Sequence, residues 1–351
     1  MTSRTVASAT PAAAAAAASV SVPLAVGSAP PPPPLAQQPS SSSDFAPFIP
    51  GFLHWVHVCN NGAAAAAAGE FLDLTVAGRT VGYLKADFAE RLLQFPDVFQ
   101  RSGSGSSGGS NGGSSGGVAV HPRLATQQQR TEAIAGVLQQ LRAEGLIEGW
   151  RDELYPAVQS FHDEPAFLIE RAAAPHFGIK AYGVHINGFV TLPDGSQELW
   201  VARRSRTKPT WPGKLDHIVA GGQPHGLSCQ ENVVKECEEE ASVPEQLAVR
   251  AKAAGAVSYT SLQPAGLKRD VLYCYDLELP ADFVPQPQDG EVEEFMRMPV
   301  HRVAEIVATT NEYKENCALV IIDWFMRHGY ITPDMPGYLD LLRGLRSGDC
   351  S

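Results

Sequence analysis

Cysteine is scarce in this 351-residue chain, and none of its six cysteines lies in a CxxC pair. They are Cys59, Cys229, Cys237, Cys274, Cys317 and Cys350. Disulfide frameworks and structural zinc sites are built from clustered cysteines, so scattered ones predict reduced thiols. We therefore expect an intracellular protein.

Long apolar runs are also missing. The longest strongly apolar stretch, 317–326, contains Asp323 and is shorter than the roughly 20 residues that span a bilayer. It predicts a buried helix, and we expect no membrane partner.

Positive charge is in the minority, with 27 Lys and Arg against 38 Asp and Glu and a formal net charge of −11. Nucleic-acid binding depends largely on Lys and Arg that neutralise phosphates, and no basic cluster is evident. We expect no nucleic-acid partner. A small anionic ligand is compatible with this charge, because a metal ion can supply the positive field.

Residues 1–43 contain no Asp or Glu, a single Arg, and many Ala, Ser and Pro. This composition resembles an organelle transit peptide, and a disordered low-complexity tail has the same composition. A secretory signal is disfavoured because no compact apolar segment adjoins a basic start. A plastid (chloroplast) is the expected compartment, with the mitochondrion and the cytosol as alternatives.

Residues 44–160 are predicted to form a small α+β domain. The segments 71–74 and 80–84 alternate around a turn, which is typical of a hairpin. Apolar residues at helical spacing follow in 127–144, and Gly145 can end that helix. These apolar residues are Ile134, Val137, Leu138 and Leu141.

A segment of almost pure Gly and Ser, 102–117, interrupts this domain. Such a composition supplies no core side chains and favours a solvated chain. It predicts a flexible loop inside the domain.

Residues 161–335 are predicted to form a second domain. The segments 182–190 and 198–203 flank a Pro-Asp-Gly turn and predict a hairpin. Further strands are expected around 218–219 and at 255–259 and 271–277, with an apolar helix at 314–327. Residues 336–351 form a carboxy-terminal tail. The fold class is mixed α/β (α+β).

A helix should begin at Cys229. Ser228 and Glu231 have the spacing of a capping box, in which each side chain bonds the backbone amide of the other residue. The residues before it, 221–227, then form a loop.

Three glutamates stand at i, i+3 and i+4 on one face of this helix: Glu236, Glu239 and Glu240. Clustered carboxylates repel one another unless a cation lies among them, and Mg²⁺ prefers a few carboxylate oxygens plus water and phosphate. Taken alone, the triplet favours a solvated acidic helix face over a site.

The surrounding sequence resembles the Nudix box, G-x5-E-x7-R-E-U-x-E-E-x-G-U with U aliphatic. Gly221 opens the match, the three glutamates fall on its metal-binding positions, and Val243 closes it. Three positions depart from the pattern: Leu227 replaces Glu, Lys235 replaces Arg and Ser242 replaces Gly. In the family the first two positions mostly support the loop and orient a catalytic Glu.

The resemblance is closer to a plant and fungal Nudix subgroup that carries an amino-terminal extension related to one fused to thiamine diphosphokinase. It rests on FGIKAYGVH at 177–185, WPGKLDHIVAGG at 211–222 and GWRDELYP at 149–156. Leu227 and Lys235 look ordinary for this subgroup. The resemblance spans about 45–335 and implies a Nudix α/β/α sandwich preceded by the small α+β domain.

The resemblance implies metal-dependent hydrolysis of a small-molecule diphosphate. In the subgroup the substrates are thiamine diphosphate and its damaged oxo and oxy analogues, converted to monophosphates. The implied cofactor is Mg²⁺ or Mn²⁺, bound by Glu236, Glu239, Glu240 and the backbone carbonyl of Ala220. Glu291, in the acidic loop 289–294, is the expected further ligand or general base.

Four basic residues that flank the site are candidates for the substrate phosphates, or else are simply solvated: Lys180, Arg203, Arg204 and Lys208. Tyr182 and Trp211 can stack on an aromatic ring of the substrate or pack in the core. The histidines at 185, 217 and 225 lack zinc spacing, so structural roles are expected.

Other functions stay open. ADP-ribose and other nucleoside diphosphate derivatives compete as substrates, because the box itself does not select the attached group. A non-catalytic ligand-binding module and an isopentenyl diphosphate isomerase are further alternatives, although the isomerases need a Cys near Val219 and this chain has none there. A homodimer is a family-level expectation.

Overall fold

The computed structural model describes residues 45–102, 116–208, 210–288 and 290–349, all of them in one compact unit. The transit-peptide-like segment 1–43, most of the Gly/Ser segment 102–117 and Asp289 of the acidic loop lie outside the described residues. Among the residues described, no helix combines the length and the hydrophobicity needed to cross a membrane.

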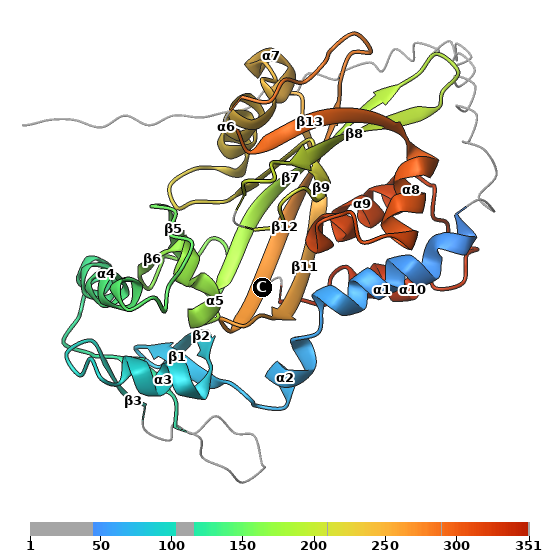
Figure 1. The fold of residues 1–351 in the computed structure, drawn as a ribbon. Helices are drawn as coiled ribbons and strands as arrows, with labels where there is room; N and C mark the ends of the chain where they lie inside the picture. The colour runs from blue at the N-terminus through green and yellow to red at the C-terminus, as the bar shows by residue number, and fades with distance from the viewer. Residues whose placement is uncertain (1–44, 103–115, 209, 289, 350–351) are drawn as a thin grey trace, which may run out of the picture. The chain divides into compact units, whose positions relative to one another are not determined.

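A seven-stranded mixed sheet forms the centre of the fold (Figure 1). Its strands are β7 (Lys180–Thr191), β8 (Gln197–Arg204), β9 (Leu215–His217), β10 (Val219–Gly222), β11 (Lys252–Leu262), β12 (Leu267–Glu278) and β13 (Val292–Pro299). The main path runs β11-β12-β7-β8-β13, with β12 parallel to β7. The strands expected at 255–259 and 271–277 are confirmed as parts of β11 and β12.

The predicted hairpin of β7 and β8 is confirmed, but the two strands pair only next to the turn, from Phe189↔Leu199 to Thr191↔Gln197. Beyond that point β7 pairs with β10, from Ile186↔Val219 to Gly183↔Gly222. The short strand β10 therefore lies against the middle of the long strand β7.

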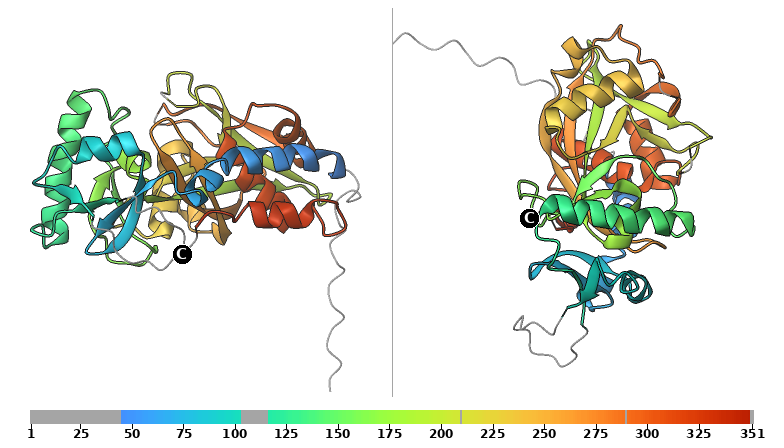
Figure 2. Two further views of the ribbon diagram at one scale, coloured as in Figure 1. Left: turned by 90° about the horizontal axis from the view of Figure 1, so that it is seen from below. Right: turned by 90° about the vertical axis from the view of Figure 1, so that its left-hand side faces the viewer.

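Helices cover both faces of this sheet (Figure 2). On one face α6 (Cys229–Ala241) and α7 (Glu245–Ala248) pack on Val184 and Ile186. On the other face α8 (Val300–Thr309) and α9 (Glu315–Arg327) pack on Phe189. Alternate residues of β7 thus enter opposite cores, and the expected α/β/α sandwich is confirmed.

Helix α1 (Ile49–Cys59) packs with α9 and α10 (Tyr338–Gly344), although it lies inside the segment 44–160 that the sequence assigns to the small domain. Its Trp55 indole donates to the Val307 carbonyl at 2.6 Å. A Cβ at Gly51 would lie 2.0 Å from the Ala308 carbonyl oxygen, so α1 touches the backbone at the end of α8. The expected tail 336–351 likewise contains a helix packed in this core.

A separate four-stranded sheet precedes the sandwich, in the order β2-β1-β4-β3. Its strands and helices are β1 (Leu72–Val76), β2 (Arg79–Leu84), α3 (Ala86–Leu92), β3 (Phe99–Arg101), β4 (Val118–Val120) and α4 (Gln127–Ala143). The predicted β1–β2 hairpin and the helix α4 are confirmed, and Gly145 adopts the positive φ of 76° that suits a helix end. Strands β3 and β4 pair on the two sides of the Gly/Ser segment.

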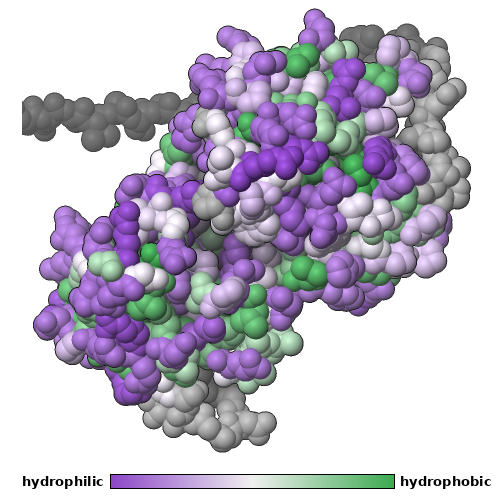
Figure 3. All heavy atoms as spheres, in the orientation of Figure 1, coloured by the Kyte–Doolittle hydropathy of each residue, from purple (hydrophilic) through white to green (hydrophobic). Residues whose placement is uncertain are grey.

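A short connection links this sheet to the sandwich. It consists of β5 (Leu154–Pro156), β6 (Leu168–Glu170), the 3-10 turn η3 (Arg171–Ala173) and α5 (Ala174–Phe177). Two elements complete the chain order, η2 (Ala46–Phe48) and α2 (Ala63–Ala67). Hydrophilic residues cover most of the face seen in Figure 3, with hydrophobic residues in small separate groups.

Candidate active site

Helix α6 begins at Cys229, as predicted. The Ser228 hydroxyl accepts from the Glu231 amide at 3.2 Å, and the Glu231 carboxylate accepts from the Ser228 amide at 2.8 Å. This capping box fixes the first turn of the helix. Val233 and Cys237 are fully buried, so the rotation of α6 about its axis is also fixed.

Glu236 lies directly against β10. A Cβ at Gly221 would be 2.3 Å from Cδ of Glu236, so only glycine leaves room for this carboxyl group. Burial raises the pKa of Glu236, and the neighbouring Lys235 ammonium opposes that rise. The need for glycine at position 221, the first position of the Nudix box, is thus steric in this structure.

Glu240 is the most deeply buried member of the triplet, at 9% exposure. Its Oε2 accepts a hydrogen bond of 3.0 Å from the Ala220 amide. Burial raises the pKa of Glu240 well above its ordinary value, and the negative charges of Glu236 and Glu291 act in the same direction. Ala220, the expected carbonyl ligand, is therefore adjacent to this carboxyl group.

Glu239 is half exposed, and its carboxylate lies 2.6 Å from the Lys235 ammonium. Lys235 also reaches Glu236 at 3.3 Å, from the box position at which the pattern has Arg. The Lys235 ammonium thus forms ion pairs with two of the three carboxylates of the triplet.

The oxygen donors of the triplet suit a hard divalent cation in their chemistry, although among the described residues only His185, His217 and Cys317 bring three ligand atoms within 4.8 Å of one another. Three carboxylates lie along one helix face, and burial raises the pKa values of Glu236 and Glu240. Carboxylate oxygens are the ligands that Mg²⁺ and Mn²⁺ prefer.

Glu291 begins the approach to β13, and its carboxylate forms an ion pair with Lys208. Its carbonyl oxygen accepts from the Ser205 amide at 2.8 Å. Burial acts to raise the pKa of Glu291, but the hydrogen bond and charge of Lys208 outweigh it, so the pKa is lowered. Glu291 lies within electrostatic range of Glu240. The ion pair with Lys208 and the hydrogen bond from the Ser205 amide hold the loop after β8 against the loop before β13.

The structure does not gather the four predicted phosphate-binding residues in one place. Arg203 pairs with Glu294 at 2.9 Å, and Arg204 pairs with Asp216 at 3.0 Å. Lys180 is buried at the start of β7 and pairs with Asp349 at 2.9 Å. The ion-pair partners of Arg204 and Lys208, which are Asp216 and Glu291, both act electrostatically on Glu240.

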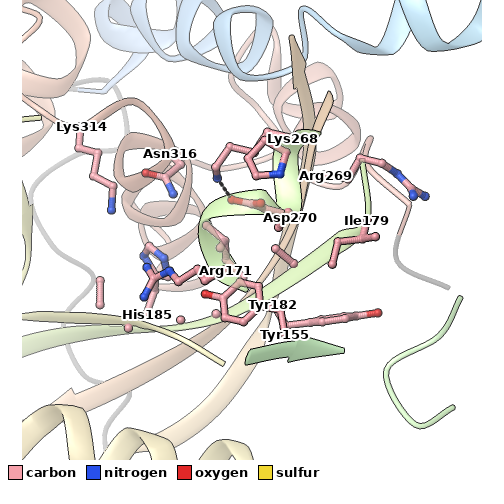
Figure 4. Close-up of a pocket in the computed structure, with 18 of the residues that line it drawn as sticks. Tyr155, Arg171, Ile179, Tyr182, His185, Lys268, Arg269, Asp270, Lys314 and Asn316 are labelled. Carbon is pink, nitrogen blue, oxygen red and sulfur yellow. Dashed lines mark hydrogen bonds and ion pairs between the residues drawn. The ribbon is translucent and has the colours of Figure 1, made fainter. Parts of the chain in front are cut away.

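A pocket opens on the other side of β10 (Figure 4), with an empty volume of about 750 Å³ counting its open mouth. Its floor includes Ala220, Gly221 and Gly222. Aromatic and charged residues line its walls: Tyr155, Arg171, Tyr182, His185, Trp211, Lys268, Arg269, Asp270 and Lys314. Tyr182 and Trp211, the predicted stacking candidates, are both among them.

The sequence reasoning missed the charged residues of this pocket. Lys268 and Asp270 form an ion pair on β12, and Lys314 precedes α9. No local motif marks any of them, because they join the pocket only when β12 pairs with β7 and α9 packs against the sheet. Tyr155 belongs to the GWRDELYP segment, which carried a signal of resemblance but not of a site.

His185, His217 and Cys317 form a buried group whose nitrogen and sulfur atoms lie within 4.8 Å of one another. Burial lowers the pKa of His217 to about 4. The adjacent Asp216 accepts from the Cys317 thiol at 2.7 Å and pairs with Lys314 at 3.4 Å. Nitrogen and sulfur donors suit Zn²⁺ rather than Mg²⁺, but Lys314 already supplies a positive charge there.

Comparison with known families matches residues 182–317 to the NUDIX domain and residues 51–181 to a domain of unknown function. The chain is 49% identical over 303 residues to Nudix hydrolase 20, chloroplastic, of Arabidopsis thaliana, covering 86% of this chain and 79% of that protein. It is also 49% identical over 313 residues to Nudix hydrolase 24, chloroplastic, of the same plant, covering 89% and 81%. Among solved structures, the MutT protein from Methanosarcina mazei Go1 matches with 19% identity and a TM-score of 0.32, over 41% of this chain and 94% of that one.

Proposed function

Because this chain belongs to the Nudix hydrolase family, whose members hydrolyse small-molecule diphosphates, we propose that its substrates are thiamine diphosphate and the damaged oxo and oxy analogues. The products are the corresponding monophosphates. One observation carries the proposal: an aromatic-lined pocket and the glutamate triplet adjoin the same short strand, β10. In this proposal the ring of a bound diphosphate lies in the pocket and its phosphates extend past β10 toward the carboxylates of the triplet, none of which lines the pocket itself.

Glu236, Glu239 and Glu240 hold a divalent cation, Mg²⁺ or Mn²⁺, together with the Ala220 carbonyl. Such a cation, when bound, neutralises charge on the diphosphate and promotes the ionisation of water. The Ala220 amide bonds Glu240 and so fixes the direction of its carboxylate. Gly221 leaves the space in which the Glu236 carboxylate lies.

Glu291 accepts the proton of the attacking water or acts as a further ligand. A general base has to be ionised, and the Lys208 ammonium keeps the Glu291 carboxylate in that state. The same ion pair holds the loop after β8 against the start of β13.

Tyr182 and Trp211 bind the organic part of the substrate. Aromatic faces suit the thiazole and pyrimidine rings of thiamine, since stacked rings attract one another beyond the area they bury. Asp270 and Lys268 add hydrogen-bonding groups at the pocket wall, which can distinguish an oxidised ring from an intact one.

Lys208 is a proposed phosphate-binding residue, and its ion-pair partner Glu291 acts electrostatically on Glu240. Lys180, Arg203 and Arg204 remain proposed phosphate-binding residues. Each forms an ion pair with a carboxylate, so a substrate role requires an exchange of partners.

A substrate panel tests the assignment. The purified protein is incubated with Mg²⁺ and thiamine diphosphate, its oxo form, ADP-ribose or a nucleoside diphosphate, and monophosphate release is measured. Higher kcat/KM for the thiamine compounds supports the proposal. Preference for ADP-ribose or a nucleoside diphosphate would contradict the thiamine assignment and indicate a nucleotide-derived substrate. No turnover of any of these compounds would favour a non-catalytic binding module.

The proposed compartment is the plastid. The two Arabidopsis relatives are named chloroplastic, and residues 1–43 have the composition of a transit peptide. A fluorescent fusion to residues 1–60 tests this: import into chloroplasts supports it, and fluorescence in mitochondria or the cytosol contradicts it.

A further inference from the structure

We propose that Arg171, which lies before the family domain, binds the diphosphate of the substrate, and that the segment 151–171 is therefore part of the active site. This inference rests on the proposed function for the identity of the substrate. It assigns a role to the part of the chain that matches only a domain of unknown function.

Strand β10 brings this segment to the catalytic carboxylates. Its two adjacent glycines face opposite sides. A Cβ at Gly221 would strike the Glu236 carboxyl group, whereas a Cβ at Gly222 would lie 2.0 Å from the Tyr155 hydroxyl oxygen and 3.1 Å from a guanidinium nitrogen of Arg171. At these two positions only the backbone of β10, without side chains, lies between Arg171 and Glu236.

The backbone also joins the two regions. The His225 amide, in the loop before α6, donates to the Leu154 carbonyl at 3.1 Å. Strand β5 therefore lies beside the loop that leads into the metal-binding helix, and Figure 4 shows Tyr155 and Arg171 in the pocket together with His185 and Lys268.

Charges of the segment act on the catalytic carboxylates. Burial lowers the pKa of Arg171, but the negative groups around it, Glu236 among them, outweigh this effect and raise the pKa. Glu153 contributes to the raised pKa of Glu236, and Arg151 contributes to the lowered pKa of Glu291. The segment thus lies within electrostatic range of both sides of the site.

Arg171 is held in place yet still has donors to offer. One terminal nitrogen donates to Glu153 at 2.7 Å, and the guanidinium lies 5.7 Å from the centre of the Tyr155 ring. Its side chain is 43% exposed. A guanidinium has five N–H donors in a planar fork that matches phosphate oxygens, so one bond to Glu153 leaves a second edge for a diphosphate.

A purely structural ion pair and a substrate-binding arginine predict different effects for the two partners. Arg171→Ala and Glu153→Gln both break the pair. If the pair only holds the segment in place, the two variants behave alike. If Arg171 binds diphosphate, Arg171→Ala weakens binding, whereas Glu153→Gln removes a competing negative charge and leaves binding equal or tighter.

The test measures calorimetric binding of inorganic diphosphate in Mg²⁺ to the full-length protein. Arg171→Ala should bind about tenfold more weakly or worse, because a hydrogen bond to a charged group contributes roughly 1.5–3 kcal/mol. Arg171→Lys keeps the charge without the fork and should show a loss of several-fold. The matched control is Arg101→Ala, which breaks an exposed Arg–Glu pair with Glu90 at 2.8 Å on β3 and should not change binding.

The outcomes are separable. Equal losses in Arg171→Ala and Glu153→Gln, binding by Arg171→Ala within twofold of the unaltered protein, or no binding by the unaltered protein would each overturn the inference. If Arg171→Ala does not fold, unchanged binding by Arg171→Lys overturns it in the same way. A binding loss in Arg171→Ala with no turnover on the substrate panel would support the diphosphate site and reject the proposed substrates.

Discussion

The Ala220 amide donates a hydrogen bond of 3.0 Å to Oε2 of Glu240, across 20 residues of sequence. This bond connects β10 to the last turn of α6. A buried carboxylate costs free energy unless it is hydrogen-bonded or paired, and Glu240 has Glu236 and Glu291 as negative neighbours. A cation bound among these carboxylates would balance their negative charge and so account for the burial of Glu240.

Metal binding should stabilise the protein against heat. A ligand that binds only the folded state at a hundredfold excess over its Kd adds about 2.7 kcal/mol, which corresponds to a rise in Tm of roughly 4 °C for a folded chain of this size. We expect such a rise with Mg²⁺ or Mn²⁺, reversed by EDTA, in thermal unfolding. In Glu240→Gln most of the rise should be lost, and an equal rise in that variant would place the metal elsewhere.

Gly221→Ala should impair metal binding more than folding. The new Cβ would meet the Glu236 carboxyl group, which is the flexible end of a side chain and can move aside. We expect a small change in Tm. Mn²⁺ affinity should fall about tenfold or more, because the displaced Glu236 carboxylate no longer binds the metal. The control is Gly136→Ala on α4, where nothing lies within 4 Å. Mn²⁺ affinity of Gly221→Ala equal to that of the control would contradict the steric role.

Asp276 should contribute to stability above pH 4. Burial acts to raise its pKa, but hydrogen bonds from His328 and Arg327 outweigh it and lower the pKa to about 2. A lowered folded-state pKa gives stability that is complete above the unfolded value of roughly 4 and is lost as pH falls toward 2. In urea unfolding, Asp276→Asn should therefore be about 1–3 kcal/mol less stable at pH 7, with a gap that narrows below pH 4. A gap that stays constant down to pH 3 would contradict this account.

Local sequence signals predicted the glutamate-bearing helix α6 well. The Ser228–Glu231 box fixes the first residue of α6, and helical spacing then places the glutamates on one face. Both signals act within a few residues, so no knowledge of the rest of the fold is needed.

Contacts between distant segments could not be predicted in this way. Trp55 bonds Val307, 252 residues away, so α1 joins a core that its own surroundings do not reveal. Lys180 lies in the FGIKAYGVH segment on which the family resemblance rests, but its side chain pairs with Asp349, 169 positions further along the chain. Arg171 lies in a three-residue turn without any pattern, and its place beside Gly222 follows only from the packing of β5 on the loop before α6.

The most direct test of the catalytic role of the triplet is turnover of thiamine diphosphate and its oxo form in Mg²⁺ by Glu240→Gln, with Glu238→Gln on the same helix as the control. Glutamine preserves the oxygen that accepts from Ala220 but removes the charge, so the fold should persist. We expect Glu240→Gln to lose about a hundredfold or more in kcat, since a cation clamp supplies several kcal/mol to the transition state, while the exposed Glu238 position tolerates the change. Unaltered turnover in Glu240→Gln would contradict the account.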